Sequence, residues 1–196
     1  MYESNQKLIS QIKSKLKETL SENRYTHILS VVETACFIGK NHNMDTTKLT
    51  FAALLHDIAK NYTLEQLIDF CSSRNLELDD IEINNHGLLH GKVARIIAQE
   101  DYQIHDEDIL NSISSHTTGR VYMSGYEEVI FVADYSEPSR SLHNSEAITE
   151  IALVNLSEAV FKVITEKLIY VIETGRTIHP RSIDTYNYYR TKINAS

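Results

Sequence analysis

The sequence predicts an all-α fold, and three observations support this. Apolar residues recur every three or four positions along most of the chain, as on one face of a helix. The 196 residues include only 6 Gly and 2 Pro, the residues that most often interrupt helices. Runs of alternating β-branched residues, which indicate strands, are few. We expect a single domain over residues 1–196, with its core at about 20–180.

The first two expected helices cover residues 8–43. An amphipathic helix begins the chain, and we expect it to pack on the domain by the apolar face that carries Leu8, Ile12, Leu16 and Leu20. Ser21 begins the second helix, which ends at Gly39 or in the asparagine-rich stretch after it.

The third expected helix holds two polar residues in an apolar run. Asp45 or Thr46 can cap it, and it continues through residues 51–60, FAALLHDIAK, where His56 stands beside Asp57. Burying either side chain without a partner costs about 2–7 kcal/mol, so partners should exist. A transition-metal ion suits an imidazole beside a carboxylate. The dipeptide alone leaves a buried hydrogen-bonded pair open as the alternative. Lys60 lies one turn later, near the same face.

The later helices follow from caps and periodicity. Residues 63–66 form a T-x-x-Q capping box, residues 76–85 are acidic and irregular, and a helix over 88–100 carries His90 near its start. Acidic residues 106–108 begin a helix that ends at His116.

Three more helical stretches complete the chain. A helix over 126–135 carries Asp134 near its end and is stopped by Pro138. Residues 144–174 read as one long helix ending at Gly175. Ser182 caps a tyrosine-rich last helix, which we expect to pack on the domain.

Composition excludes several classes of protein. The net charge of −8 argues against a surface for nucleic-acid polymers. Two isolated cysteines, Cys36 and Cys71, do not make a disulfide framework. Residues 1–10 lack the apolar region of a signal peptide, and the longest apolar runs are too short to span a bilayer. We therefore expect a cytoplasmic protein without a membrane partner.

Six polar residues each interrupt or border an apolar helical run, and they come from five expected helices. Packed helices can bring distant positions into one pocket. The six are His27, His56, Asp57, His90, His116 and Asp134. Among the other histidines, we expect His42 and His105 in solvated loops and His143 in a loop. His86 precedes His90 by four residues, which is a spacing found between metal ligands. It is the alternative to His90 as a site residue, although it lies before the expected helix.

The order H…HD…H…H…D resembles that of HD-superfamily metal-dependent phosphohydrolases. More closely, the chain is similar to symmetrical bis(5′-nucleosyl)-tetraphosphatases of the YqeK type. The stretches that carry this resemblance lie between Arg24 and Asn187, and they are RYTH, LLHDIAK, LLHGKVA, HTTGR, VADYSEPSR and TGRTIHP…YN. The chain departs from the family after His90, where Gly91, Lys92 and Val93 stand in place of small residues with a proline.

The resemblance implies a role for each matching residue. A divalent or trivalent transition metal, with iron expected and manganese compatible, would be held by His27, His56, Asp57 and Asp134. His90 and His116 would touch substrate phosphate, bind a second ion or serve as acid and base, with Asp57 and Lys60 also catalytic. The polyphosphate would contact Arg24, Lys60, Thr117 and Arg140. The nucleoside would rest near Gly175, Arg176, Thr177, Ile178, His179 and Pro180, although His179 could simply pack before Pro180.

The implied reaction is conversion of diadenosine tetraphosphate to two ADP. A bound metal lowers the pKa of its water and acts as a Lewis acid, and cations stabilise the phosphoryl charge. Two alternatives remain: another HD phosphohydrolase acting on deoxynucleotides or cyclic nucleotides, or a catalytically silent nucleotide-binding regulatory protein. The expected partner is a dinucleoside polyphosphate or ADP, and a homodimer is left open.

Overall fold

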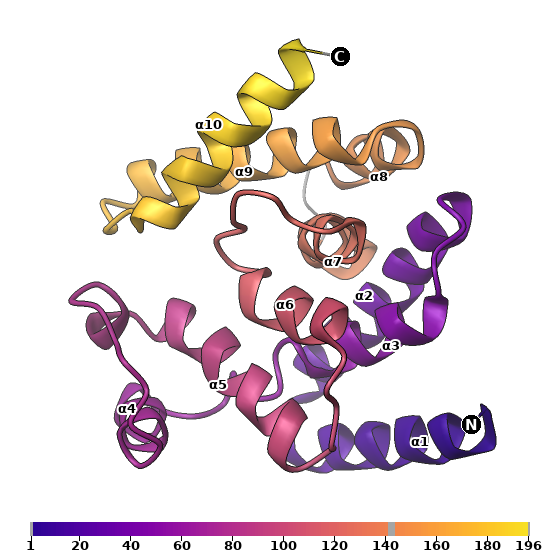
Figure 1. Ribbon diagram of the computed structural model, residues 1–196, viewed down its shortest axis with the longest axis vertical. Helices are drawn as coiled ribbons and strands as arrows, with labels where there is room; N and C mark the ends of the chain where they lie inside the picture. The colour runs from indigo at the N-terminus through magenta and orange to yellow at the C-terminus, as the bar shows by residue number, and fades with distance from the viewer. Residues whose placement is uncertain (1, 141–143, 196) are drawn as a thin grey trace.

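The computed structural model describes residues 2–140 and 144–195, and within these ranges it contains helices and no strands. The all-α prediction is therefore confirmed. Figure 1 labels the helices along the chain. They are α1 (Tyr2–Thr19), α2 (Glu22–Asn41), α3 (Thr46–Leu55), α4 (Leu64–Ser72), η1 (Glu82–Asn84), α5 (His86–Glu100), α6 (Glu107–Ser115), α7 (Gly125–Ser136), η2 (Pro138–Arg140), α8 (Ser145–Val154), α9 (Leu156–Glu173) and α10 (Pro180–Asn194).

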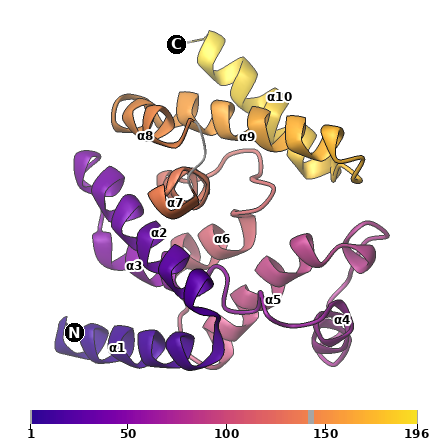
Figure 2. The same cartoon turned by 180° about the vertical axis from the view of Figure 1, so that it is seen from behind.

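Helix α7 is the centre of the bundle. It packs against α2, α3, α6, α8 and α9. Residues 129–133 are fully buried, which explains why this stretch is apolar on every side rather than on one stripe. Figures 1 and 2 show α1 at one end of the molecule and the α9–α10 pair at the other, with α7 between them. Asp134 therefore lies on a helix that is enclosed by five others.

Several predicted helix ends are confirmed. Ser21, Asp45 and Thr63 are the N-caps of α2, α3 and α4, and Thr63 forms the predicted capping box with Gln66. Gly175 follows α9 with a φ of +64°, the left-handed conformation that glycine adopts without steric cost.

The third helix ends earlier than predicted, at Leu55 rather than residue 60. His56 Nδ1 donates to the carbonyl oxygen of Ala53 at 2.7 Å. In a continuing α-helix, that oxygen would accept from the backbone N–H of Asp57. The chain continues instead in tighter turns, with Lys60 N bonded to Asp57 O at 2.9 Å. The histidine side chain thus helps to end the helix beside the carboxylate.

The expected helix over 144–174 is in fact two helices, broken at Asn155. This residue has an extended backbone, with φ −145° and ψ 98°. Its side chain accepts a hydrogen bond from Glu158 N, so Asn155 is the N-cap of α9. An asparagine followed three residues later by a glutamate was the available signal.

Three smaller predictions are also wrong. Helix α10 begins at Pro180 with His179 as its cap, so Ser182 lies inside it. His86 is the first residue of α5 rather than a residue before it. His42 is half-buried, with Nε2 2.7 Å from the carbonyl oxygen of Ala152, while His105 is exposed as expected.

His143 lies outside the described residues. Within residues 2–140 and 144–195, none of the helices is both long and apolar enough to cross a membrane.

Candidate metal centre

The six polar residues converge in the interior of the bundle. His27 comes from α2, His90 from α5 and Asp134 from α7, while His56 and Asp57 follow α3 and His116 follows α6. The side chains of all six are buried. The structure therefore brings together every residue of the predicted H…HD…H…H…D set.

The four histidines present the same ring nitrogen to the centre. In each ring, Nδ1 faces an atom that can only accept a hydrogen bond, so Nδ1 carries the proton and Nε2 keeps its lone pair. The acceptors are Glu137 Oε1 for His27 at 2.9 Å, Ala53 O for His56 at 2.7 Å, His86 O for His90 at 3.3 Å and Ile113 O for His116 at 2.7 Å. This is the tautomer that ligates a metal through Nε2.

One carboxylate oxygen of Asp57 and one of Asp134 face the first histidine pair. Asp134 Oδ1 lies 3.3 Å from His27 Nε2 and 3.6 Å from His56 Nε2. Asp57 Oδ2 lies 4.0 Å from His27 Nε2 and 3.8 Å from His56 Nε2. The donor atoms of His27, His56 and Asp57 lie within 4.8 Å of one another, and Asp134 Oδ1 lies beside both Nε2 atoms.

The other oxygen of Asp57 faces the second histidine pair. Asp57 Oδ1 lies 3.0 Å from His90 Nε2 and 3.7 Å from His116 Nε2. The two Nε2 atoms are themselves 2.9 Å apart. Because both rings hold their proton on Nδ1, two lone pairs would meet here unless a proton or cation lies between them. Asp57 therefore lies between two donor clusters. The first contains His27, His56 and Asp134, and the second contains His90 and His116.

These donor atoms fit a metal ion. Among the described residues, His56 Nε2 and Asp57 Oδ1 are the buried side-chain atoms without a hydrogen-bond partner of acceptable geometry. Leaving such atoms unsatisfied costs about 1–3 kcal/mol each. Coordination would satisfy both, and mixed imidazole and carboxylate donors suit a divalent ion.

The pKa values of the carboxyl groups favour ligation. Burial alone would raise the pKa of Asp57, but the nearby His56, His90 and Lys60 hold it well below its usual range. Burial acts on Asp134 in the same way, but the charges of Arg140 and Lys167 and the contacts with His27 and His56 together outweigh it, so the pKa of Asp134 is also well below its usual range. Both carboxylates are therefore ionised at neutral pH.

The histidines of the second pair are neutral at the same pH. Burial lowers the pKa of both His90 and His116, and for His116 the neighbouring His90 lowers it further. His56 differs: burial would lower its pKa, but Asp57 and Asp134 raise it above the ordinary value. The second pair can thus accept hydrogen bonds or a proton at Nε2.

Cations surround the cluster. Arg24 Nη1 donates to Asp57 Oδ2 at 2.6 Å, and Arg140 Nη2 donates to Asp134 Oδ1 at 2.8 Å. Lys60 Nζ lies 3.1 Å from His90 Nε2 and 3.4 Å from Asp57 Oδ1. The Thr117 hydroxyl lies 3.2 Å from His116 Nε2. The four residues predicted to hold polyphosphate are therefore all in contact with the donor cluster.

Sequence reasoning missed two residues of this site. Lys167, on α9, donates to the carbonyl oxygen of His116 at 2.9 Å and lies 3.7 Å from Asp134 Oδ2. Burial lowers its pKa to about 8. Glu137, just after α7, is fully buried and bonds His27. Glu137 stands within the quoted stretch VADYSEPSR, whereas Lys167 has no local signal.

The segment over residues 175–180 connects α9 and α10 and is mostly exposed. Its buried residue, His179, caps α10 through Nδ1 and places Nε2 2.9 Å from Asp79 Oδ2. Glu82 is close to this pair but is bonded to Lys92 at 2.6 Å. His179 thus ties α10 to the acidic segment before α5.

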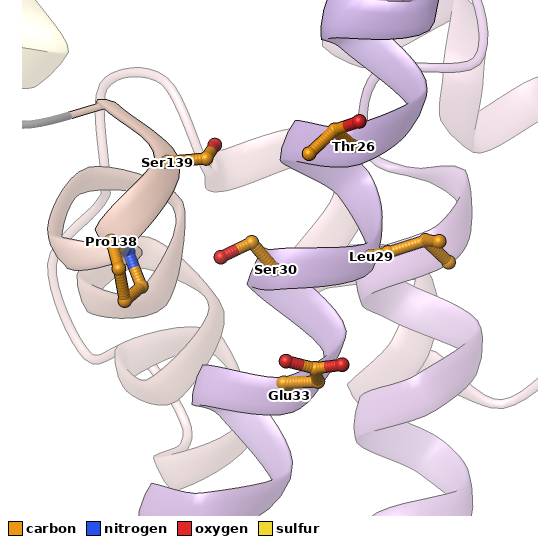
Figure 3. A pocket seen from close by; sticks show the side chains of 6 residues that line it. All are labelled: Thr26, Leu29, Ser30, Glu33, Pro138 and Ser139. Carbon is orange, nitrogen blue, oxygen red and sulfur yellow. The ribbon is translucent and has the colours of Figure 1, made fainter.

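A groove lies beside the donor cluster, not within it. It has a volume of about 470 Å³ and separates α2 from η2. Figure 3 shows Ser30 directed from α2 toward Pro138 across this groove, with Ser139 nearby. Its lining residues neighbour His27 and Glu137 in the chain, so the groove borders the outer side of the cluster. Chemistry, rather than volume, identifies the candidate site.

Comparisons with known proteins agree with this site. A protein-family model described as the HD domain matches residues 24–139. A Staphylococcus aureus protein named symmetrical bis(5′-nucleosyl)-tetraphosphatase is 33% identical over 92% of this chain and 94% of its own length. A Halalkalibacterium halodurans protein of the same name is also 33% identical, over 88% of this chain and 91% of its own.

A solved structure is also similar. It is a crystal structure of a predicted HD superfamily hydrolase involved in NAD metabolism, from Clostridium acetobutylicum. It is 37% identical, covers 93% of this chain and 97% of its own, and has a TM-score of 0.89.

Proposed function

This chain belongs to the HD domain family and groups within it with the symmetrical bis(5′-nucleosyl)-tetraphosphatases, and we propose that it hydrolyses diadenosine tetraphosphate and related dinucleoside tetraphosphates to two nucleoside diphosphates. One observation carries the proposal: the Nε2 atoms of four histidines converge on the carboxylate of Asp57 inside a ring of cations. That arrangement combines metal ligands with a place for a polyphosphate anion.

His27, His56, Asp57 and Asp134 would hold the metal, for which we propose iron, with manganese also compatible. When bound, such an ion supplies a Lewis acid and lowers the pKa of water. His90 and His116 would lie on the second side of Asp57, where their Nε2 atoms can orient water or phosphate oxygens, or hold a second ion.

The polyphosphate would be held by Arg24, Lys60, Thr117 and Arg140. Arginine and lysine offer only donors, so they match phosphoryl oxygens, and their charges stabilise the transition state of phosphoryl transfer. The segment over residues 175–180 would border the nucleoside. Because His179 is already bonded to Asp79, its part would be to hold this segment in place.

The proposed reaction adds one water across the central anhydride. The water oxygen forms a bond to an inner phosphorus, the bond from that phosphorus to the central bridging oxygen breaks, and the second ADP leaves on that oxygen. Protons from the water are taken up by His90 Nε2, His116 Nε2 or solvent. The protein would act in the cytoplasm.

Product analysis tests this function. The purified protein is incubated with diadenosine tetraphosphate and added Fe²⁺ or Mn²⁺, and the nucleotides are separated by chromatography. ADP as the only product supports the proposal. Equal amounts of AMP and ATP would refute symmetric cleavage. No turnover with either ion would refute the proposed activity and favour a nucleotide-binding regulatory protein.

A further inference from the structure

Glu137 is a buried carboxylate with a specific place beside the cluster. It is the residue that follows α7, where an extended backbone (φ −61°, ψ 142°) directs the chain away from the helix axis. Its side chain is fully buried. A buried carboxylate needs partners to offset the loss of hydration, so its contacts indicate why a glutamate stands here.

The neighbours of this carboxylate are donors. Oε1 accepts from His27 Nδ1 at 2.9 Å and from the Ser139 hydroxyl at 2.7 Å, while Oε2 accepts from Ser139 N at 2.6 Å. The Ser30 hydroxyl also donates a hydrogen bond to this carboxylate. Both oxygens of Glu137 therefore accept hydrogen bonds.

The bond to His27 has a consequence for the opposite side of that ring. A carboxylate accepting from Nδ1–H fixes the tautomer, holds the ring plane and makes Nε2 a stronger donor to a metal. His27 Nε2 is the atom that lies 3.3 Å from Asp134 Oδ1. Ser139 and Ser30 then hold the carboxylate itself, from η2 and α2.

We propose that Glu137 is the positioning residue that fixes His27 for metal binding. This inference rests on the metal site of the proposed function and deepens it. Glutamine has nearly the same shape but brings an amide N–H₂ group among these donors. One orientation of the amide would set N–H₂ against His27 Nδ1–H, and the other would set it against Ser139 N–H. Either orientation would therefore disturb the position of the His27 ring, directly or through the loss of the bond from Ser139.

The test measures metal affinity in Glu137→Gln, by titration with Mn²⁺ in competition with a chelator of known affinity. Loss of such a partner typically weakens metal binding about 10–100-fold, so the Kd should rise by that factor. Glu128→Gln is the matched control, because Glu128, which lies on α7, is also a buried carboxylate but accepts hydrogen bonds from Tyr189 and Lys192. It should keep the Kd within about twofold while being destabilised.

The outcomes separate this inference from the proposed function. Tight binding by the wild type with an unchanged Kd in Glu137→Gln would overturn the inference and leave the metal site standing. No Mn²⁺ binding by the wild type would overturn both. If Glu137→Gln does not fold, the wild type still decides: nitrogen NMR of the zinc-loaded protein should show His27 protonated at Nδ1, and ligation through Nδ1 would overturn the inference.

Discussion

The ammonium group of Lys167 donates to the carbonyl oxygen of His116 at 2.9 Å, and it lies 3.7 Å from Asp134 Oδ2. Its Nζ also lies over the ring of Phe131, 4.2 Å from the ring centroid. One side chain from α9, outside the residues matched by the HD domain model, thus joins a residue of each donor cluster.

Replacing Lys167 by Met should therefore impair the site while keeping the apolar stem. We expect kcat to fall about tenfold, as when a partner of a ligand is lost, with KM changing less. Lys167→Arg should restore most of the rate because it keeps the charge and the donors. Lys162→Met, an exposed position on the same helix, is the control. Steady-state kinetics of the three variants give the answer, and an unimpaired Lys167→Met would contradict the prediction.

Replacing Asp57 by Ala should abolish metal binding. Asp57 faces both histidine pairs, so its loss removes a donor from each. Elemental analysis should find little metal in a folded variant. Metal at 100 times its Kd adds about 2.7 kcal/mol of stability to a protein that binds it. The ion should thus raise the melting temperature of the wild type and leave the variant unchanged. Full metal content in a folded Asp57→Ala would show that the ligand assignment is wrong.

Replacing Lys60 by Ala should affect the substrate rather than the metal. An ammonium cannot ligate a cation, and Lys60 lies beside His90, on the side of Asp57 where phosphate is expected. Loss of a charged hydrogen bond, worth about 1.5–3 kcal/mol, should lower kcat/KM by roughly 10–150-fold. Metal content should equal that of the wild type. If Lys60→Ala binds less metal than the wild type, the assignment of Lys60 to phosphate binding is wrong.

Replacing Gly119 by Ala should destabilise the turn after His116. The glycine has a φ of +64°, and a Cβ there would lie 2.6 Å from Thr185 Cγ2. Gly175 has the same φ with no atom within 4 Å of its Cβ position, so Gly175→Ala isolates the backbone cost of about 1 kcal/mol.

Gly119→Ala should cost that amount plus about 1–3 kcal/mol for the overlap. Denaturant unfolding measures both variants. Adding Thr185→Ser, which removes Cγ2, should recover part of the loss, and a purely additive double variant would argue against the overlap.

The fold class and the six converging residues could be predicted from the sequence. Both depend on local signals, namely the apolar periodicity and the polar residues that interrupt it. His56 ended its helix early because its own side chain takes the carbonyl of Ala53, a bond that periodicity does not register. The break at Asn155 was missed because apolar spacing continues across it. His179 rather than Ser182 caps α10 since it is also held by Asp79, a residue 100 positions away.

Lys167 and Glu137 show the same limit within the site. Lys167 is a lysine in an amphipathic helix. Its role depends on α9 packing against α7, which brings its side chain to the carbonyl oxygen of His116, and no local pattern reports that contact. Glu137 is next to a proline in a loop, and only its burial and its bond to His27 set it apart. Residues that act through others are recognised by their contacts, whereas candidate ligands are recognised by their chemistry.

The tethered Nδ1 atoms of the four histidines bear on which ions the site would select. Each ring is already held by an acceptor, so little side-chain rotation remains to be lost when an ion arrives. A frame of this rigidity does not adjust its donor spacing to the size of each ion. The site would then prefer the first-row metal ion whose bond lengths best match these fixed donor positions. This preference would add to the general order in which such ions bind nitrogen and oxygen donors.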